Sequence, residues 1–353
     1  MGKINDCSLW NCRKMQLNNR QADPPVLLLH NLDPRWEREA MDATLDEVQQ
    51  LKAALEGEGH SVVEAPVRND DLGRILEPFN PDHFIVFNWC EELPGLTRSD
   101  ARVAAVLEDM GFTYTGSPSN VLALSWNKPA CKSLMNLHGI PTPSWQLVTS
   151  DAPDRWNNFP AIVKPAFEHC SVGISREAVA MDPEELASRI AFVRKELQQP
   201  ALIEDFIDGR EFHVTLLGNG VMEMLPPAEM DYSAFDNPRD RLCSFDSKFT
   251  PGSIPYESIE IHVPARLNAQ EHDQLKDVAM RAYEGFNCRD YGRIDLRSLD
   301  GRIYVLDINP NADVSPDTSL ALAAEAAGLT CGMVASQLVH LAAARHPLFG
   351  TVT

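Results

Sequence analysis

Several features that would assign this chain to a familiar class are missing. No run of about 18 apolar residues occurs, so we expect no membrane-spanning helix. Residues 1–22 lack the apolar core of a secretory signal. Basic residues are few, since 31 Lys and Arg stand against 51 Asp and Glu, for a formal net charge of −20. This balance argues against binding to nucleic acid or to an anionic membrane, because both attract positive surface.

The common metal, redox and nucleotide motifs are also absent. The eight cysteines are scattered and form no C-x-x-C pair, so neither a zinc ribbon nor a thioredoxin-type motif is supported. There is no Walker A sequence, G-x-G-x-x-G, H-E-x-x-H or G-x-S-x-G. Scattered cysteines without a secretory signal are typical of a reduced, cytoplasmic protein. The composition, 44% hydrophobic and 23% charged, is nevertheless that of a folded chain.

Strand and helix patterns alternate along the chain. An apolar run at 26–29 is followed by helical spacing over 35–56, by strand patterns at 61–63 and 83–87, and by a helix at 98–110. This alternation predicts an α/β fold with a parallel sheet covered on both faces. The other predicted strands are 161–165, 201–206, 212–217, 221–225, 291–297 and 302–308, and the other predicted helices are 119–138, 183–198, 268–285, 318–327 and 331–345.

The patterns divide the chain into four segments. We expect a loose N-terminal extension at 1–24, a first α/β domain at 25–120, a central domain at 121–212 and a C-terminal domain at 213–353. Inside the last of these, residues 231–258 form a long polar segment. Loops of that length in compact domains are usually functional or disordered.

The strongest local signal is the stretch 291–313, where two alternating apolar runs flank Asp300-Gly301. Such flanks predict a β-hairpin. Side chains alternate between the two faces of a strand, so the loop length decides which of them meet. A three-residue loop with Gly301 in a bulge would set Asp295 opposite Val305 and diagonal to Asp307, whereas a two-residue loop would separate the two carboxylates. We expect the three-residue loop.

With that register, four polar side chains share one face of the hairpin: Arg293, Asp295, Asp307 and Asn309. Hard oxygen donors at that spacing suit Mg²⁺, which usually also binds substrate phosphates. The alternative is a solvated hairpin face with charges at every second position, which the spacing alone supports about equally. Asn309 favours a functional site, because asparagine is a poor strand residue.

Three further stretches could contact a phosphorylated ligand. Lys164 ends the apolar run 161–165 and could reach a phosphate, although an edge strand with one outward lysine explains it as well. The backbone N–H groups of the following loop, 169–173, could wrap phosphate oxygens. The strand pattern at 202–212 runs into acidic residues that could accept from an adenine amino group or a ribose hydroxyl. The alternative for this stretch is a hairpin turn with a solvated rim.

Taken in order, these features resemble the ATP-grasp superfamily and, within it, the D-alanine–D-alanine ligase family, over roughly residues 25–345. Residues 111–117 resemble the end of the family's first domain, and 139–143 (Gly-Ile-Pro-Thr-Pro) match the family closely. Residues 245–249 resemble the mobile loop that closes over ATP. The resemblance implies three α/β subdomains, with ATP bound between the central and C-terminal ones.

The resemblance also implies roles for individual residues. The implied ATP-binding residues are Lys128, Lys164, Glu204, Phe206, Ile207 and Glu211, with Glu211 on the ribose. The implied ligands of Mg²⁺, or of Mn²⁺, are Asp295, Asp307 and Asn309. The implied catalytic residues are Arg293, Ser171 and Lys248, and the implied substrate contacts are Glu37, Cys170, Phe249 and Ser319.

Three departures from the family pattern concern the metal and the substrate. Asp307 replaces a glutamate of the metal motif, Cys170 replaces a serine of the substrate loop, and Phe249 replaces the tyrosine that pairs with it.

We therefore expect an ATP-dependent ligase that joins a carboxylate to an amine of small amino-acid-like substrates through an acyl phosphate. The alternatives are a true D-alanine–D-alanine ligase and a nucleotide-binding protein without turnover. A homodimer is a family-level expectation.

Overall fold

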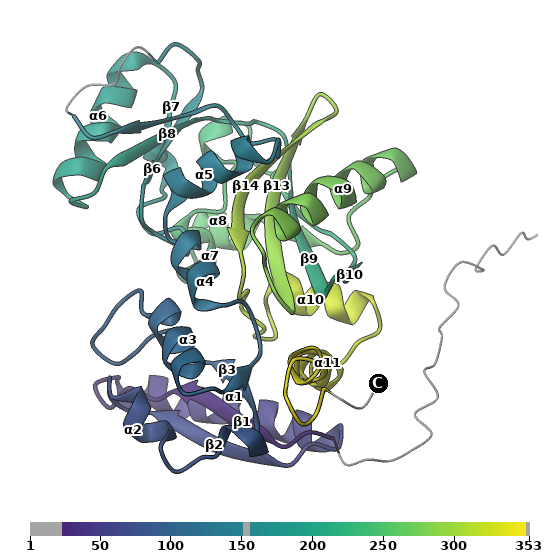
Figure 1. Ribbon diagram of the computed structural model, residues 1–353. Coiled ribbons are helices and arrows are strands. Elements are labelled where there is room, and N and C mark those ends of the chain that lie inside the picture. The colour runs from purple at the N-terminus through teal and green to yellow at the C-terminus, as the bar shows by residue number, and fades with distance from the viewer. Residues whose placement is uncertain (1–22, 151–155, 351–353) are drawn as a thin grey trace, which may run out of the picture.

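The computed structural model describes residues 23–150 and 156–350, which form three β-sheets with their helices (Figure 1). All but two residues of the predicted N-terminal extension, 1–24, lie outside the described residues. The predicted domain boundaries at residues 120 and 212 stay predictions, although each of the three sheets is built from one continuous part of the chain.

The first sheet is parallel, as predicted, with the strand order β2-β1-β3-β4. Its elements are β1 (Val26–Asn31), α1 (Arg38–Gly57), β2 (Val62–Val67), α2 (Leu72–Leu76), β3 (Ile85–Trp89), α3 (Asp100–Asp109) and β4 (Thr113–Tyr114). Both faces are covered: Val26 and Leu28 pack on the α1 side, and Leu27 and Leu29 on the α2 and α3 side. All four side chains are fully buried, which is why this strand reads as a continuous apolar run.

The predicted helix 119–138 is two helices, α4 (Ser119–Ser125) and α5 (Lys128–Leu137). The break lies at Asn127, whose side-chain oxygen accepts from the backbone N–H of Ala130 at 3.1 Å and so caps α5. The second sheet follows, antiparallel and in the order β5-β8-β6-β7. Its elements are β5 (Trp145–Val148), β6 (Ala161–Pro165), β7 (Val179–Ala180), α6 (Pro183–Lys195) and β8 (Ala201–Asp205).

The third sheet is antiparallel, in the order β12-β11-β9-β13-β14, with β10 paired to β9. Its strands are β9 (Arg210–Asn219), β10 (Val221–Met224), β11 (Ala228–Asp231), β12 (Glu260–His262), β13 (Tyr291–Leu299) and β14 (Arg302–Asn309). Helix α9 (Ala269–Gly285) covers one face and begins with a capping box between Asn268 and Glu271. The polar segment 231–258 holds two short helices, α7 (Phe245–Phe249) and α8 (Ile254–Ser258).

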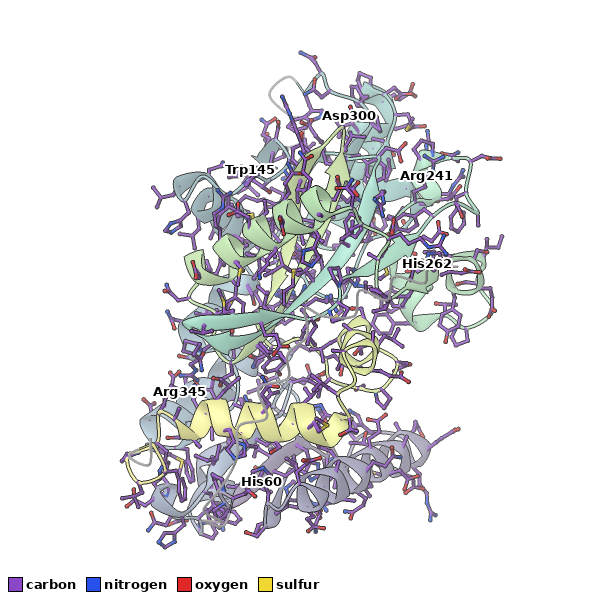
Figure 2. The ribbon with its side chains drawn as sticks, turned by 90° about the vertical axis from the view of Figure 1, so that its right-hand side faces the viewer. His60, Trp145, Arg241, His262, Asp300 and Arg345 are labelled. Atoms are coloured by element: carbon purple, nitrogen blue, oxygen red, sulfur yellow. The ribbon has the colours of Figure 1, made fainter. Side chains whose placement is uncertain are left out.

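The chain ends with two helices, α10 (Ser319–Ala326) and α11 (Cys331–Ala343), and α11 returns to the first sheet (Figures 1 and 2). Arg345, just after α11, pairs with Asp290 at 2.5 Å and donates to the carbonyl of Tyr114 at 3.0 Å. It therefore ties the first sheet to the start of β13. Among the described residues, no single helix has the length and apolarity to cross a membrane; α10 and α11 reach that threshold only together, across a 100° bend.

The β13–β14 hairpin is confirmed, but the predicted three-residue loop is wrong. Leu299 pairs with Arg302, which leaves a two-residue turn in which Asp300 and Gly301 both have positive φ, 50° and 75°. Two positive φ angles are the mark of a type I′ turn, whose twist matches that of the strands. This turn by itself would separate the two carboxylates, so a second irregularity has to restore their alignment.

That irregularity is a β-bulge further along the hairpin. Leu296 pairs with Val305, yet the next pair is Asp295 with Asp307, so Leu306 is the extra residue on β14. Asp295 and Asp307 are therefore direct cross-strand partners, and not the diagonal neighbours that we expected.

The alternative prediction of a hairpin turn at Asp208-Gly209 is also wrong. Strands β8 and β9 belong to different sheets, and residues 206–209 pass from one sheet to the other. Gly209 is required there, because a Cβ atom at this position would lie 2.0 Å from the carbonyl oxygen of Ser298.

Candidate active site

The hairpin brings four of the predicted site residues together. The guanidinium of Arg293 donates to both carboxylate oxygens of Asp295, from Nε at 2.7 Å and from Nη2 at 3.0 Å. The Asn309 amide also donates to Asp295, at 3.0 Å. Asp307 lies on the same face and pairs with Nζ of Lys128 at 2.5 Å. The three predicted metal ligands thus form one cluster with two predicted cations, Arg293 and Lys128.

Lys128 reaches this cluster from the first residue of α5. A cation is disfavoured at a helix N-terminus, because the helix dipole is positive there. Asp307 compensates this charge across the gap between the helix and β14. The backbone N–H of Lys128 also donates to the carbonyl of Ala166 at 3.1 Å, which fixes α5 against the end of β6.

Both carboxylates of the cluster are ionised at neutral pH. Burial would raise the pKa of Asp307, but Lys128, with smaller contributions from other neighbours including Lys164, holds that pKa well below the usual range. Burial and the neighbouring Arg293 oppose each other at Asp295 in the same way, and its pKa is also lowered. The oxygen donors of Asp295, Asp307 and Asn309 on one sheet face fit a hard divalent cation such as Mg²⁺ by their chemistry.

A second cluster lies beside the first and contains two of the predicted ATP-binding residues. Lys164 at the end of β6 donates to Oε2 of Glu204 on β8 at 2.6 Å. Lys132, on α5, contacts the other oxygen of Glu204 at 2.9 Å. Lys132 and Glu204 are 2% and 1% exposed, so this is a buried ion pair shared by two lysines.

The charge of Glu204 depends on these lysines. Burial would raise its pKa, yet Lys132 and Lys164 lower it to about 2. The family resemblance implies that Glu204 binds ATP, and its carboxylate is already engaged by two lysines. Its role toward a nucleotide stays a prediction, while its role in positioning Lys164 is visible in the structure.

The predicted ribose contact, Glu211 on β9, is buried next to Arg297 on β13. Oε2 of Glu211 accepts from Nε of Arg297 at 2.7 Å and from the hydroxyl of Tyr232 at 2.9 Å. Arg297 also donates to the carbonyl of Ile207 at 2.7 Å and lies 4.8 Å over the Phe206 ring. One arginine thus contacts both Phe206 and Ile207, two of the predicted ATP-binding residues.

The predicted phosphate loop, 169–173, contacts the long segment between β11 and β12. Cys170 and Ser171 both adopt positive φ, at 53° and 59°. The Ser171 hydroxyl donates to the carbonyl of Cys243 at 2.8 Å, and the backbone N–H of Phe245 donates to the carbonyl of Ile174 at 3.1 Å. The loop and the segment that begins α7 therefore lie against each other.

Lys248 and Phe249, in α7, are exposed, and so is Cys170. Lys248 is close enough to Asp295 and to Cys170 to lower the pKa of each. At Cys170 burial outweighs this and raises the pKa, whereas at Asp295 Arg293 and Lys248 act together against burial and the pKa is lowered. These three predicted residues therefore border the hairpin cluster on its accessible side. The Phe249 ring contacts the Phe245 ring, with centroids 4.9 Å apart.

Two predicted substrate contacts lie elsewhere. Glu37 precedes α1, is exposed and makes no side-chain capping bond. Ser319 is buried at the start of α10, where its hydroxyl contacts Nδ1 of His213 at 3.0 Å. Among the described residues, neither side chain bonds directly to Arg293 or Asp295, but His213 links Ser319 to the cluster, since its Nε2 lies 3.9 Å from Oδ1 of Asp295.

Sequence reasoning missed Lys132, Arg297, His213 and His169. Lys132 follows Lys128 by one helical turn, but a lysine on a helix is usually solvated, so the sequence carried no usable signal. The imidazole of His169 packs edge-on against Trp126, with ring centroids 4.3 Å apart. Burial lowers the pKa of His169 to about 4, so the imidazole is neutral at physiological pH although Asp307 is near.

Comparisons with known proteins identify related sequences and a related structure. A family model described as "D-ala D-ala ligase C-terminus" matches residues 134–340. The chain is similar to the "Uncharacterized protein y4sG" of Sinorhizobium fredii, at 31% identity over 83% of this chain and 86% of that protein. It is also similar to the D-alanine–D-alanine ligase of Desulforudis audaxviator, at 28% identity over 83% of this chain and 91% of that enzyme.

A solved structure has the same fold. The D-alanine–D-alanine ligase from Bacillus anthracis complexed with ATP matches with a TM-score of 0.68 at 19% identity, covering 90% of this chain and 97% of that chain. This likeness confirms the ATP-grasp fold that the sequence motifs predicted.

Proposed function

This chain belongs to the D-alanine–D-alanine ligase family, and we propose that it is an ATP-dependent ligase that joins the carboxylate of one amino-acid-like substrate to the amine of another. One observation carries the proposal. One face of the hairpin holds Arg293 and the oxygen donors Asp295, Asp307 and Asn309, and Lys128 pairs with Asp307. Phosphoryl transfer needs this combination, because its catalysis consists mainly of positioning and charge neutralisation.

The reaction proceeds in two steps. The donor carboxylate attacks the γ-phosphoryl group of ATP and gives an acyl phosphate and ADP. The acceptor amine then attacks the acyl carbon, loses a proton and expels inorganic phosphate. Lys128, Lys164 and Lys248 neutralise charge on the phosphates, and a cation held by Asp295 and Asp307 with Asn309 would add to that neutralisation when bound.

Arg293 has a separate task in the second step. Attack of the amine produces a tetrahedral oxyanion, and a fixed guanidinium stabilises such a charge as it develops. Asp295 holds Arg293 by two hydrogen bonds, so the donor is oriented before the reaction begins. One donor of this kind typically lowers the barrier by about 3–4 kcal/mol.

The substrates are proposed to be small amino acids or similar molecules. The relatives named D-alanine–D-alanine ligases support this class. Cys170 and Phe249, which stand where the family has serine and tyrosine, favour a pair of substrates other than two D-alanines. Both side chains are exposed beside the cluster, where a substrate can reach them.

ATP as the nucleotide, Mg²⁺ or Mn²⁺ as the cation, a cytoplasmic location and a homodimer are parts of the same proposal. The ATP complex of the Bacillus anthracis enzyme supports the nucleotide. The all-oxygen donor set supports the cation, because Mg²⁺ and Mn²⁺ prefer oxygen ligands.

The test is release of ADP by the purified protein with Mg-ATP and a panel of D- and L-amino acids, singly and in pairs. The Lys248→Ala variant should lower kcat at least tenfold, whereas Lys195→Ala, an exposed lysine on α6, should leave it unchanged. Both side chains are exposed, so neither change should affect folding. Release that depends on D-alanine alone would identify the classical activity, and another substrate would define a new pair. No release over the panel by a protein that binds ATP would contradict the ligase proposal.

A further inference from the structure

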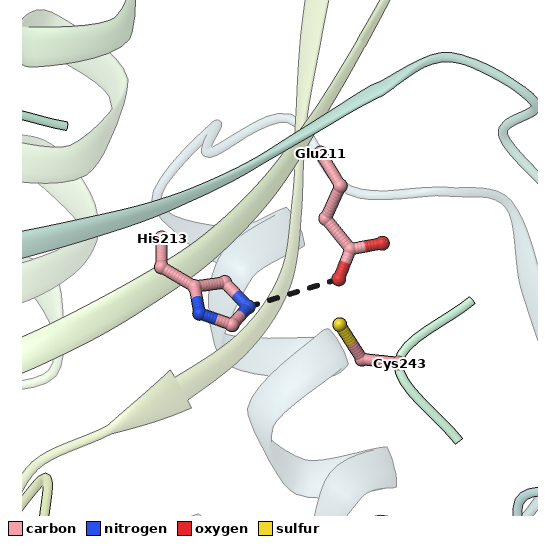
Figure 3. A group of neighbouring side chains, drawn as sticks. All are labelled: Glu211, His213 and Cys243. Carbon is pink, nitrogen blue, oxygen red and sulfur yellow. Dashed lines mark ion pairs between the residues drawn. The ribbon is translucent and has the colours of Figure 1, made fainter. Parts of the chain in front are cut away.

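Three potential metal ligands of different chemistry meet beside the hairpin cluster (Figure 3). Glu211 and His213 are two residues apart on β9 and project from the same face, and Cys243 approaches from the segment before α7. Their ligand atoms all lie within 4.8 Å of one another. Nε2 of His213 is 3.8 Å from Oε1 of Glu211, which is too long for a hydrogen bond and suits two ligands of one ion.

The surroundings orient the ligand atoms of His213 and Glu211 toward the common centre, while Sγ of Cys243 contacts the Tyr232 hydroxyl at 3.2 Å. Ser319 contacts Nδ1 of His213 at 3.0 Å, which fixes the imidazole and leaves Nε2 directed at the cluster. Arg297 and Tyr232 both bind Oε2 of Glu211, which leaves Oε1 as the available oxygen. Partners of this kind, on the atom that does not bind the metal, are a regular feature of protein metal sites.

A fourth donor lies within reach. Oδ1 of Asp295 is 3.9 Å from Nε2 of His213, on the side facing the hairpin. A nitrogen, a thiolate sulfur and carboxylate oxygens form the donor set of Zn²⁺ and Co²⁺, whereas Mg²⁺ takes oxygen ligands. We propose that Glu211, His213 and Cys243 form a second metal site, selective for Zn²⁺-like ions, next to the catalytic cluster.

Binding requires one proton to leave. Cys243 binds an ion as the thiolate, so its thiol proton has to be released when the ion binds. The metal–sulfur bond forms as the S–H bond breaks, and the proton goes to solvent. The thiolate and the Glu211 carboxylate then balance the two charges of the ion.

The position of Cys243 gives the site a structural consequence. Its carbonyl oxygen accepts from Ser171 in the predicted phosphate loop, at 2.8 Å. An ion held by Cys243 and β9 therefore fixes the segment before α7 against both the third sheet and this loop. Asp295 is shared with the predicted Mg²⁺ site, and Glu211 is also the predicted ribose contact. An ion at the second site is therefore expected to compete with the binding of Mg-ATP.

Cobalt spectroscopy tests the site without any substrate. Co²⁺ added to the chelator-treated full chain should produce a near-ultraviolet thiolate-to-cobalt band and the visible bands of a four-coordinate ion, and Zn²⁺ should displace both. Cys243→Ser should abolish the thiolate band. Cys170→Ser and Cys331→Ser, which change exposed cysteines, should retain it. Ser319→Ala should weaken Co²⁺ affinity about 10- to 100-fold through the freed imidazole.

Three results of the cobalt titration would contradict the second metal site. No thiolate band, a band that survives Cys243→Ser, or a band lost with Cys170→Ser would each overturn the proposal. If Cys243→Ser fails to fold, the Ser319→Ala affinity and the two exposed-cysteine variants still decide. Because the bands require neither ATP nor turnover, their absence would leave the proposed ligase function untouched.

Discussion

Replacing Glu204 with glutamine removes the one negative charge shared by the buried Lys132 and the half-buried Lys164. The carboxylate contacts Lys164 at 2.6 Å and Lys132 at 2.9 Å, and the glutamine amide fills the same space without the charge. The buried ammonium of Lys132 and the half-buried ammonium of Lys164 then lose their shared anionic partner. We expect this variant to be among the most destabilising single changes in the second sheet.

Two independent magnitudes agree on the size of the effect. The pKa of Glu204 falls from an ordinary 4.5 to about 2, despite burial that would raise it, because of the two lysines. At 1.36 kcal/mol per pKa unit, this shift corresponds to about 3 kcal/mol of folding free energy. Removing one partner of a buried ion pair typically costs about 3–5 kcal/mol.

The pH dependence follows from the sign of the shift. A carboxyl whose pKa is lower in the folded protein adds stability above its unfolded pKa, here near 4.5, and loses it as the pH falls toward about 2. The unfolding free energy of the parent protein should therefore fall over that window more steeply than that of Glu204→Gln.

Urea unfolding at pH 7 measures the difference, with Glu284→Gln as a control because Glu284 is exposed on α9. The control should stay within about 0.5 kcal/mol of the parent. Combining Glu204→Gln with Lys164→Met should recover part of the loss, since one unpaired charge is removed with its partner. A loss below about 1 kcal/mol for Glu204→Gln, or no recovery in the double variant, would refute the reasoning.

Two further predictions concern the reaction. Cys170→Ser combined with Phe249→Tyr should raise ADP release with D-alanine if these positions set the substrate, and an unchanged rate would place specificity elsewhere. Arg293→Lys should lower kcat about 10²- to 10³-fold with the KM for ATP nearly unchanged, because one ammonium cannot replace a guanidinium oriented by two hydrogen bonds. An equal loss in ATP binding would contradict the assignment of Arg293 to the oxyanion.

Much of the fold could be predicted because its elements carry local periodicity. The run 161–165 is a strand with those bounds, and the patterns at 291–297 and 302–308 are the two strands of the hairpin. The break in the predicted helix 119–138 was also readable, since Asn127 is a good N-cap and Pro129 follows it inside the first turn. The hydrophobic spacing by itself did not reveal the break, because apolar residues continue at helical spacing on both sides of it.

The candidate site could be predicted where neighbouring residues share a strand, and not where distant residues meet. Period-two spacing predicts that Asp295, Asp307 and Asn309 share one face of the hairpin. The predicted cause of their alignment, a three-residue loop, was wrong, because a two-residue turn and a bulge produce it. The partnership of Glu211 with Arg297 joins positions 86 residues apart, and that of Lys132 with Glu204 joins α5 to β8. Such pairs arise from packing between elements, which no local pattern encodes.

Lys132 also explains how the bulge on β14 is tolerated. A bulge withdraws backbone groups from the ladder, and buried carbonyls left without partners are costly. Here Nζ of Lys132 donates to the carbonyl of Leu306 at 3.1 Å, and the Thr142 hydroxyl donates to that of Val305 at 2.9 Å. The bulge in turn sets Asp307 opposite Asp295. One buried ammonium on α5 therefore supports both the register of the carboxylate pair and the charge of Glu204, and Lys132→Met should disturb the two clusters together.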